Sequence, residues 1–146
     1  MEFDTDVKLA VYTHIAETTQ APTIAQVAER VRAPVSEVKA AYARLYRNRV
    51  LVLEADGESI RMAPPFSGVP TQHRVRVVGK EYFANCAWDA LGVPAALHQP
   101  GEVFSRCEQT LEPIRLHVDE SGPATEPCVI HFAVPAAHWW KDIVFT

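Results

Sequence analysis

The side chains best suited to chemistry lie on one short segment in the second half of the chain. Cys86 and Asp89 stand three positions apart in Cys86-Ala87-Trp88-Asp89. On a helical turn, residues at this spacing share one face, so both side chains can reach the same bound atom. A thiolate is a ligand for soft metals, and a carboxyl group can accept or donate a proton. Without a wider pattern, however, this spacing more often belongs to a small buried cysteine beside a helical aspartate.

The other candidate ligands are scattered. Cys107 and Cys128 bring the cysteine count to three, an odd number that favours free thiols in a reducing compartment. We interpret Cys107 as a buried packing residue and Cys128 as part of a core strand. The sequence has no phosphate-binding loop or dinucleotide motif, and no zinc-site pairs of the His-x-x-x-His or Cys-x-x-Cys type occur among the scattered His98, His117, His131 and His138.

Composition restricts the class of protein. The 146 residues suffice for one domain or two small ones, and a content of 48% hydrophobic and 22% charged residues excludes a disordered chain. No apolar run approaches the roughly 18 residues of a membrane span, and the N-terminus lacks the basic and apolar regions of a signal peptide. We therefore expect a soluble, cytoplasmic protein. The formal net charge of -4 argues against a strongly electrostatic binder of nucleic acid or membrane.

The first half of the chain predicts three helices and a hairpin. Thr23 and Gln26 have the spacing of a capping box, Ser36 is the expected N-cap of the third helix, and Asp56-Gly57 is the expected hairpin turn. The helices are expected at residues 7–18, 24–31 and 36–48, and the strands at residues 50–53 and 59–62. This order indicates a winged helix-turn-helix module spanning residues 1–64.

A segment rich in Pro and Gly at residues 63–68 separates this module from a second part, residues 65–146. A short helix is expected at residues 86–91, terminated by Gly92 and Pro94. Strands are expected at residues 73–78, 81–84, 102–104, 114–118 and 129–134. The predicted fold class is therefore α+β, with the winged-helix module followed by a mixed or antiparallel β domain with short helices.

Three motifs of the second part occur in the order and spacing of a known family. They are Pro65-Phe66-Ser67-Gly68-Val69-Pro70-Thr71, Ala84-Asn85-Cys86-Ala87-Trp88-Asp89-Ala90-Leu91 and Ser105-Arg106-Cys107. Together with the preceding helical module, they resemble the organomercurial (alkylmercury) lyase family over essentially the whole chain. The most specific feature is Cys-x-x-Asp after a Phe-Ser-x-Val-Pro segment and a hairpin.

The resemblance implies a reaction and a site. Enzymes of this family split a carbon–mercury bond, so the resemblance assigns Cys86 to thiolate capture of mercury and Asp89 to taking the thiol proton and returning it to carbon. It makes both residues ligands of the metal, which is substrate and product, with an external thiol as acceptor and no cofactor. It also gives Cys107 a structural role. We expect Cys86 to be the most reactive of the three cysteines.

The family uses a second catalytic cysteine, which follows a short segment that residues 139–146 resemble. If the two segments are aligned, the second cysteine would directly follow Thr146. A register that uses Cys128 instead leaves the Val-Pro and Trp-Trp segments unmatched. We expect this chain alone to bind mercurials with little turnover. Residues 143–146 are expected to form a strand beside Cys86 and Asp89, covered by a homodimer partner or a companion chain. Three interpretations of the missing second cysteine stay open: a naturally short homologue, a truncated chain and a cleaved chain.

The helical module supports a second class of function, a winged-helix transcriptional regulator that senses a thiol-reactive or metal ligand. Its third helix region carries four basic residues and one Glu, which favours DNA binding. The predicted hairpin, which would be the wing, is acidic, which opposes contact with phosphates. The basic residues are Lys39, Arg44, Arg47 and Arg49, and the wing carries Glu54, Asp56 and Glu58. We therefore interpret the module as a scaffold, with a small-molecule substrate as partner and no specific nucleic acid or membrane.

Overall fold

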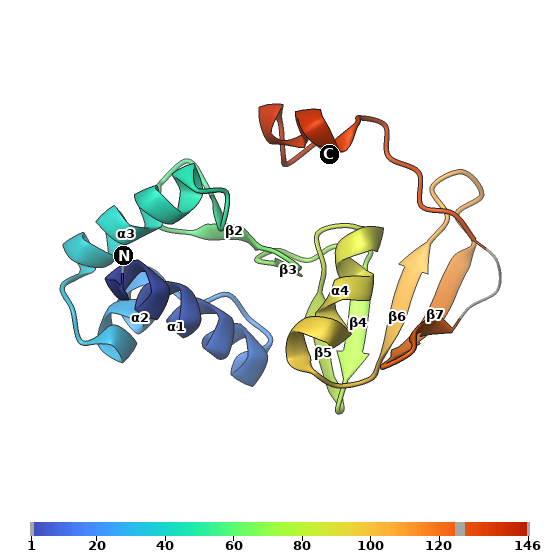
Figure 1. The fold of residues 1–146 in the computed structure, drawn as a ribbon, viewed down its shortest axis with the longest axis horizontal. Coiled ribbons are helices and arrows are strands. Elements are labelled where there is room, and N and C mark those ends of the chain that lie inside the picture. The colour runs from blue at the N-terminus through green and yellow to red at the C-terminus, as the bar shows by residue number, and fades with distance from the viewer. Residues whose placement is uncertain (1, 125–127, 146) are drawn as a thin grey trace.

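Three helices form the N-terminal part of the computed structural model, which describes residues 2–124 and 128–145 (Figure 1). They are α1 (Glu2–Thr18), α2 (Ile24–Val31) and α3 (Val35–Arg47). The capping box of α2 is confirmed, because the Gln26 N–H donates to Thr23 Oγ1 at 3.2 Å and the Thr23 N–H donates to Gln26 Oε1 at 2.8 Å. The N-cap prediction for α3 is wrong. Pro34, with ψ at 146°, is the extended residue before the helix, so Ser36 lies inside it.

A three-stranded antiparallel sheet follows, in the order β1-β2-β3. β1 (Val52–Leu53) and β2 (Ile60–Ala63) form the predicted hairpin. Asp56 Oδ1 closes the turn by accepting the N–H groups of Glu58 and Ser59, both at 2.8 Å, and Gly57 has the positive φ of 68° that the turn requires. β3 (Phe66–Ser67) pairs with β2, so the boundary expected near residue 64 falls between two paired strands.

The second part is built on a five-stranded antiparallel sheet in the order β5-β4-β6-β7-β8. Its strands are β4 (Arg74–Val77), β5 (Lys80–Phe83), β6 (Gly101–Arg106), β7 (Pro113–Asp119) and β8 (Gly122–Ala124). One helix, α4 (Ala87–Leu97), packs on the sheet through β4, β6 and β7. Valines at alternate positions of these strands are fully or almost fully buried: Val75, Val77, Val103 and Val118. The fold thus combines helices with antiparallel sheet, which confirms the α+β class.

Helix α4 is longer than predicted. Gly92 and Pro94 lie inside it, and it ends at His98, which adopts the left-handed conformation (φ 53°). Pro94 cannot donate a helical hydrogen bond, but it is buried against the sheet, where Gly101 leaves room for its ring. Burial of this apolar face offsets the lost hydrogen bond. Neither α4 nor any other helix within residues 2–124 and 128–145 is long and apolar enough to cross a membrane.

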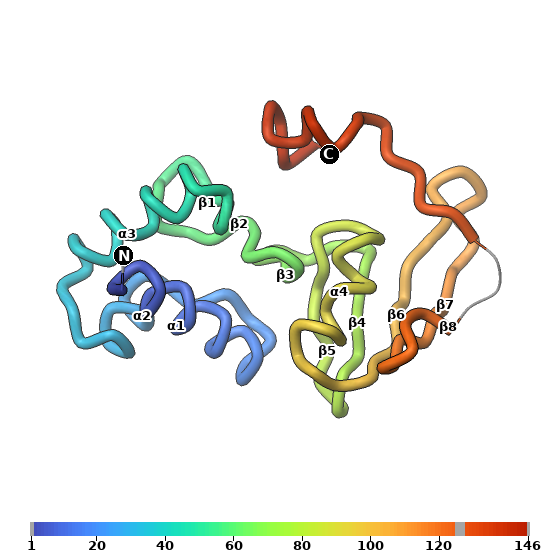
Figure 2. The backbone as a smooth tube through the Cα atoms, in the orientation of Figure 1, coloured from blue at the N-terminus to red at the C-terminus, as the bar shows by residue number. Residues whose placement is uncertain are grey.

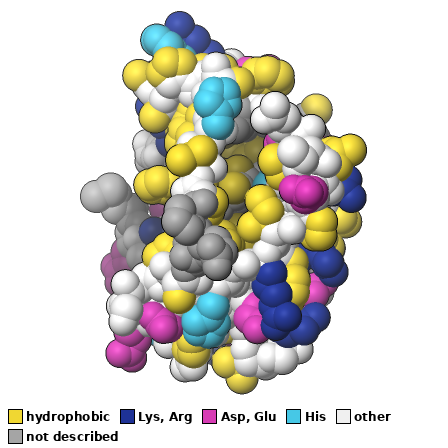
Figure 3. All heavy atoms as spheres, turned by 90° about the vertical axis from the view of Figure 1, so that its right-hand side faces the viewer, with side chains coloured by type: hydrophobic (Ala, Val, Ile, Leu, Met, Phe, Trp, Pro, Cys, Tyr) yellow, Lys and Arg dark blue, Asp and Glu magenta, His cyan; other side chains and the backbone are white. Residues whose placement is uncertain are grey.

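The opposite face of the sheet is charged. The guanidinium groups of Arg74, Arg76 and Arg115 surround the Phe104 ring, 5.1–5.8 Å from its centre. Each of these arginines also pairs with a glutamate on a neighbouring strand. On the side of the molecule drawn in Figure 3, basic side chains gather in a patch beside acidic ones. This face is solvated, so the core lies on the α4 side.

One hydrophobic core joins the two parts and continues from α1 to β7. Two tyrosine hydroxyls add hydrogen bonds across the junction. Tyr12 on α1 donates to the Pro64 carbonyl at 2.9 Å, and Tyr82 on β5 donates to the Ala16 carbonyl at 2.8 Å. Helix α1 is therefore held against the segment that leads into the second part.

Residues 128–145 return toward the N-terminal part as an extended segment followed by the 3-10 helix η1 (Ala136–Lys141) (Figure 2). The strand predicted at residues 129–134 is wrong, and residues 143–145 form a turn rather than a strand, while Thr146 lies outside the described residues. Cys128 is exposed and does not belong to a core strand. The apolar residues of this segment do not make it a strand, because residues 130–134 line the cavity described below and pair with no strand among the described residues.

Gly68 lies where the chain after β3 passes closest to β2. A Cβ atom at Gly68 would stand 2.0 Å from the Ile60 carbonyl oxygen. We expect Gly68→Ala to force the strands apart and to lower the free energy of unfolding by at least about 2 kcal/mol. Gly92→Ala is the matched control, because its nearest neighbour would be Pro65 Cβ at 3.6 Å. Alanine also favours a helix over glycine by about 1 kcal/mol. Denaturant unfolding measures both changes, and equal effects would contradict the close approach at Gly68.

Candidate functional site

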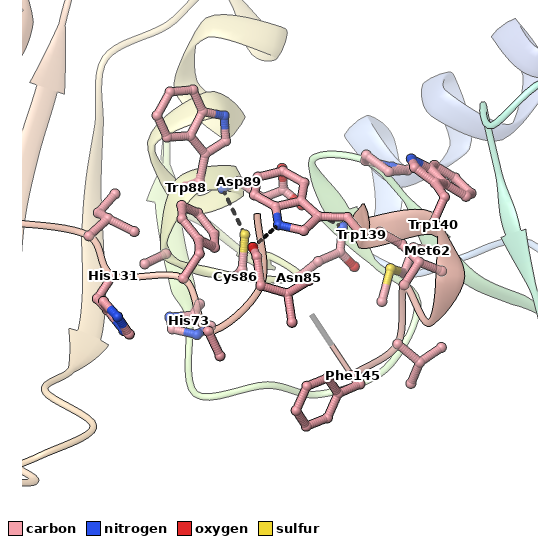
Figure 4. Close-up of a pocket in the computed structure, with 18 of the residues that line it drawn as sticks. Met62, His73, Asn85, Cys86, Trp88, Asp89, His131, Trp139, Trp140 and Phe145 are labelled. Atoms are coloured by element: carbon pink, nitrogen blue, oxygen red, sulfur yellow. Dashed lines mark hydrogen bonds between the residues drawn. The ribbon is translucent and has the colours of Figure 1, made fainter. Parts of the chain in front are cut away.

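A cavity of about 480 Å³ opens beside the N-terminus of α4 (Figure 4). The lining comes mainly from three parts of the chain: the start of α4, with Cys86 and Asp89; the end of the N-terminal part, with Arg49 and Met62; and the C-terminal segment. His73 and Glu108 complete it. Five aromatic side chains supply much of its wall: Trp88, Phe132, Trp139, Trp140 and Phe145. The volume and the apolar wall are typical of sites for small organic molecules.

Cys86 is the N-cap residue of α4, and its sulfur lies in the cavity between Trp139 and His73 (Figure 4). The backbone N–H of Asp89 donates to Cys86 Sγ at 3.4 Å. A helix N-terminus favours negative charge, because its first N–H groups have no partner within the helix. The position of Cys86 therefore stabilises a thiolate and fixes its direction, and the expected placement of Cys86 and Asp89 on one turn is observed.

Asn85 is a site residue that the sequence did not single out. Its Nδ2 donates to Asp89 Oδ2 at 2.9 Å and so holds the carboxyl group beside the cavity. Its Oδ1 is buried and has no hydrogen-bond partner among the described residues, at a cost of about 1–3 kcal/mol. The signal was present in the sequence, because Asn85 directly precedes Cys86 in the motif and stands four residues before Asp89.

Burial raises the pKa of both reactive groups. For the Cys86 thiol, burial is the main cause and the charge of Asp89 raises the pKa further, while the backbone N–H groups of Asp89 and Trp88 oppose this. For the Asp89 carboxyl, burial raises the pKa and the Asn85 hydrogen bond opposes it. The free thiol therefore keeps its proton at neutral pH, and a carboxyl group stands beside it to receive that proton.

Tyr12 on helix α1 lies near the Asp89 carboxyl group. Burial raises the pKa of the Tyr12 hydroxyl to about 12, and the negative charge of Asp89 contributes to the same shift. Tyr12 therefore lies close enough to Asp89 for the two to interact electrostatically. The N-terminal part thus contributes to the environment of the carboxyl group as well as to the cavity wall.

The other two cysteines lie elsewhere. Neither Cys107 nor Cys128 is among the described residues that line the cavity. Cys107 follows β6 in a turn, where its N–H donates to the Glu112 carbonyl at 2.9 Å, and it is partly exposed rather than buried as expected. The described part of the chain therefore places one thiol, that of Cys86, in the cavity.

The remaining polar side chains of the cavity do not form a metal centre. His73 Nδ1 lies 2.7 Å from Ser105 Oγ, and burial lowers the pKa of His73, which favours its neutral form. Glu108 is hydrogen-bonded to Gln72. Within the described ranges, no group of three or more His, Cys, Asp or Glu side chains is arranged to hold a metal ion. The start of α4 therefore offers one thiol and one carboxyl group to a cavity whose wall is largely apolar.

Comparison with known proteins agrees with this chemistry. A family described as alkylmercury lyase matches residues 66–146. Alkylmercury lyases of Bacillus cereus and Clostridium butyricum are each 34% identical to this chain over 97 residues, which cover 66% of this chain and 42% of the relative. The chain therefore spans about two fifths of the length of these relatives.

A solved structure supports the same relationship. The crystal structure of the mercury-bound form of MerB2 aligns with a TM-score of 0.63 and 26% sequence identity. The alignment covers 82% of this chain and 59% of that chain, so it extends over both the helical part and the sheet.

Replacing Asp89 with Asn should lower the thiol pKa of Cys86. The substitution removes a negative charge that raises this pKa and keeps the side-chain shape. At a pH below the pKa, a lower thiol pKa gives a larger thiolate fraction, so the midpoint of Cys86 alkylation should move to lower pH. The measurement is the rate of iodoacetamide alkylation against pH in Cys107→Ser, Cys128→Ser protein. Glu108→Gln is the control, because Glu108 also lines the cavity, and an unchanged midpoint in D89N would count against the coupling.

Cys107 should be alkylated before Cys86 at neutral pH, the reverse of the order expected from the sequence. Hydrogen bonds from the Thr110 hydroxyl and from the N–H groups of Thr110 and Gln109 lower the pKa of the Cys107 thiol. The thiolate is the nucleophile, so the lower pKa favours Cys107. Peptide mapping after limiting iodoacetamide treatment tests this order, and earlier labelling of Cys86 would refute it.

Proposed function

The chain belongs to the alkylmercury lyase family, and we propose that it cleaves carbon–mercury bonds by protonolysis, with Cys86 and Asp89 as the reacting pair. One observation carries this proposal. The thiol and the carboxyl group project from one turn of α4 into the same cavity, and the Asp89 N–H lies 3.4 Å from the sulfur. A soft-metal ligand and a proton donor are the two groups that this reaction needs.

The first step is capture of the metal. Cys86 sulfur forms a bond to mercury, the bond between mercury and its inorganic ligand breaks, and the thiol proton passes to the Asp89 carboxylate. The backbone N–H groups at the start of α4 stabilise the negative charge that develops on sulfur. The aromatic wall of the cavity accommodates the organic group of the substrate.

The second step is proton delivery. The Asp89 carboxyl group donates its proton to the carbon bound to mercury, and the electron pair of the carbon–mercury bond becomes the new carbon–hydrogen bond. The hydrocarbon leaves, while mercury remains on Cys86 sulfur with the Asp89 carboxylate as a second ligand. Burial favours the protonated carboxyl that this step consumes, and Asn85 favours the carboxylate that it leaves behind.

Release of mercury requires an acceptor. An external small-molecule thiol takes the metal from Cys86 by thiol exchange, and no resident cofactor takes part. The substrate is a small organomercurial, which fits a cavity of about 480 Å³.

We assign the N-terminal part, residues 1–64, to a winged-helix scaffold that supports a lyase domain at residues 65–146. Two of the three basic residues of α3 are paired with acidic ones: Arg44 with Asp4 at 2.7 Å and Lys39 with Glu58 at 2.7 Å. These pairs reduce the positive charge available to a phosphate backbone, which favours a scaffold over a DNA-binding regulator. Met62 and Pro64 also line the cavity, so the module helps to form the site.

Release of benzene from phenylmercury tests the assignment. Three variants that each keep one cysteine are compared in excess small-molecule thiol. We expect slow benzene release, still above the thiol-only rate, from the variant that keeps Cys86, because the described part of the chain places one thiol in the cavity. Adding Asp89→Asn to that variant should lower the rate at least about 100-fold, because general acid catalysis contributes that much or more. Mercury capture should persist. Equal release by the variant that keeps Cys107, or undiminished release by D89N, would overturn the assignment.

A further inference from the structure

Arg49 stands at the edge of the cavity in a constrained backbone position. It follows α3 with a positive φ of 60°, a conformation that costs free energy for a residue with a side chain. Its N–H donates to the Tyr46 carbonyl at 3.0 Å, and the next N–H, that of Val50, donates to the Leu45 carbonyl at 2.9 Å. This turn directs the Arg49 side chain toward the cavity, where its guanidinium carbon lies 5.8 Å from the centre of the Trp140 ring.

The Arg49 guanidinium group brings a positive charge to the cavity. Within the described ranges Arg49 forms no salt bridge, whereas Arg44 and Lys39 of the preceding helix are both paired. The two carboxyl side chains that line the cavity are hydrogen-bonded to other groups, Asp89 to Asn85 and Glu108 to Gln72. The cavity therefore holds a thiol, an aromatic wall and a guanidinium group that pairs with no carboxylate of the described residues.

A guanidinium group presents its donors in a planar fork that matches a carboxylate. The cation–π contact with Trp140, at 5.8 Å from the ring centre, holds the group at the cavity without using those donors. A ligand that satisfies the whole cavity therefore has mercury at one end for Cys86, an apolar body for the aromatic wall and a carboxylate at the other end for Arg49.

We propose that Arg49 is a carboxylate-binding residue, which makes the cavity selective for organomercurials whose organic group carries a carboxylate over neutral ones. The proposal rests on mercury capture by Cys86, as proposed above, but not on cleavage. With para-hydroxymercuribenzoate, the sulfur–mercury bond forms, the mercury–hydroxide bond breaks, and hydroxide leaves with the thiol proton as water. The carboxylate of the bound adduct pairs with Arg49.

The experiment is a competition at Cys86 in Cys107→Ser, Cys128→Ser protein. The protein receives equal excess amounts of para-hydroxymercuribenzoate and phenylmercury hydroxide, with a small thiol present to allow exchange. Intact mass spectrometry immediately after mixing gives the ratio of the two adducts. We expect the carboxylated adduct to be favoured about fivefold to tenfold, as for a partly exposed charge-assisted pair. The preference should persist in part in Arg49→Lys and fall to about one in Arg49→Met.

Arg47→Met is the matched control, because Arg47 is an exposed cation close in sequence that does not line the cavity. It should leave the adduct ratio unchanged. Circular dichroism shows whether each variant is folded. If Arg49→Met is not folded, the partial preference expected of Arg49→Lys still tests the proposal. The same ratio in the Arg49 protein and in R49M, or an equal loss in R47M, would overturn the proposal. Failure to release hydrocarbon would reject protonolysis and still leave the adduct ratio readable.

Discussion

The packing of α4 on the sheet is the constraint on which the site depends. Ala90 and Val93 are fully buried, and Pro94 approaches the sheet at Gly101, where a Cβ atom would come within 3.0 Å of the proline ring. This close approach fixes the helix over β4 and β6. Because Cys86 is the N-cap residue of that helix and Asp89 lies in its first turn, the same packing determines where the thiol and the carboxyl group meet the cavity.

The N-terminal part and the C-terminal segment supply the other residues around the site. The N-terminal helices place Tyr12 near Asp89, and the turn after α3 brings Arg49 to the cavity edge. The C-terminal segment supplies aromatic side chains, held in part by a hydrogen bond from Trp139 Nε1 to the Val134 carbonyl at 2.7 Å and by contact between the Trp139 and Phe132 rings. A small organic molecule bound beside Cys86 would therefore contact residues that are far apart in the sequence.

Local patterns in the sequence predicted most of the elements. The capping box of Thr23, the Asp56-Gly57 turn and the alternation in residues 73–84 depend on neighbours within a few positions, and each is observed. The motif around Cys86 and Asp89 likewise placed both side chains on one turn. Family membership was recognised from the order of the motifs and is confirmed by the comparisons.

What the sequence could not predict depends on tertiary packing. Pro94 was expected to end α4, but burial against Gly101 keeps it inside the helix. Residues 129–134 are almost all apolar, as in a buried strand, yet in the structure residues 130–134 line the cavity and the segment has no strand assignment. The sequence analysis counted Arg49 among the basic residues of the third helix region, and its place in the cavity lining emerges only when α3 and the C-terminal segment are placed together. These are contacts between distant segments, which a local pattern does not contain.

The central claim is that Cys86 and Asp89 act on one bound organomercurial. A crystal structure of the Asp89→Asn protein with phenylmercury tests it most directly, because this variant should capture the substrate without cleaving it. The account predicts mercury bonded to Cys86 sulfur, with the ring carbon that carries it within about 3–3.5 Å of the substituted side chain at position 89, the distance of a reacting pair. Mercury on Cys107 or Cys128, or a ring carbon directed away from position 89, would contradict it.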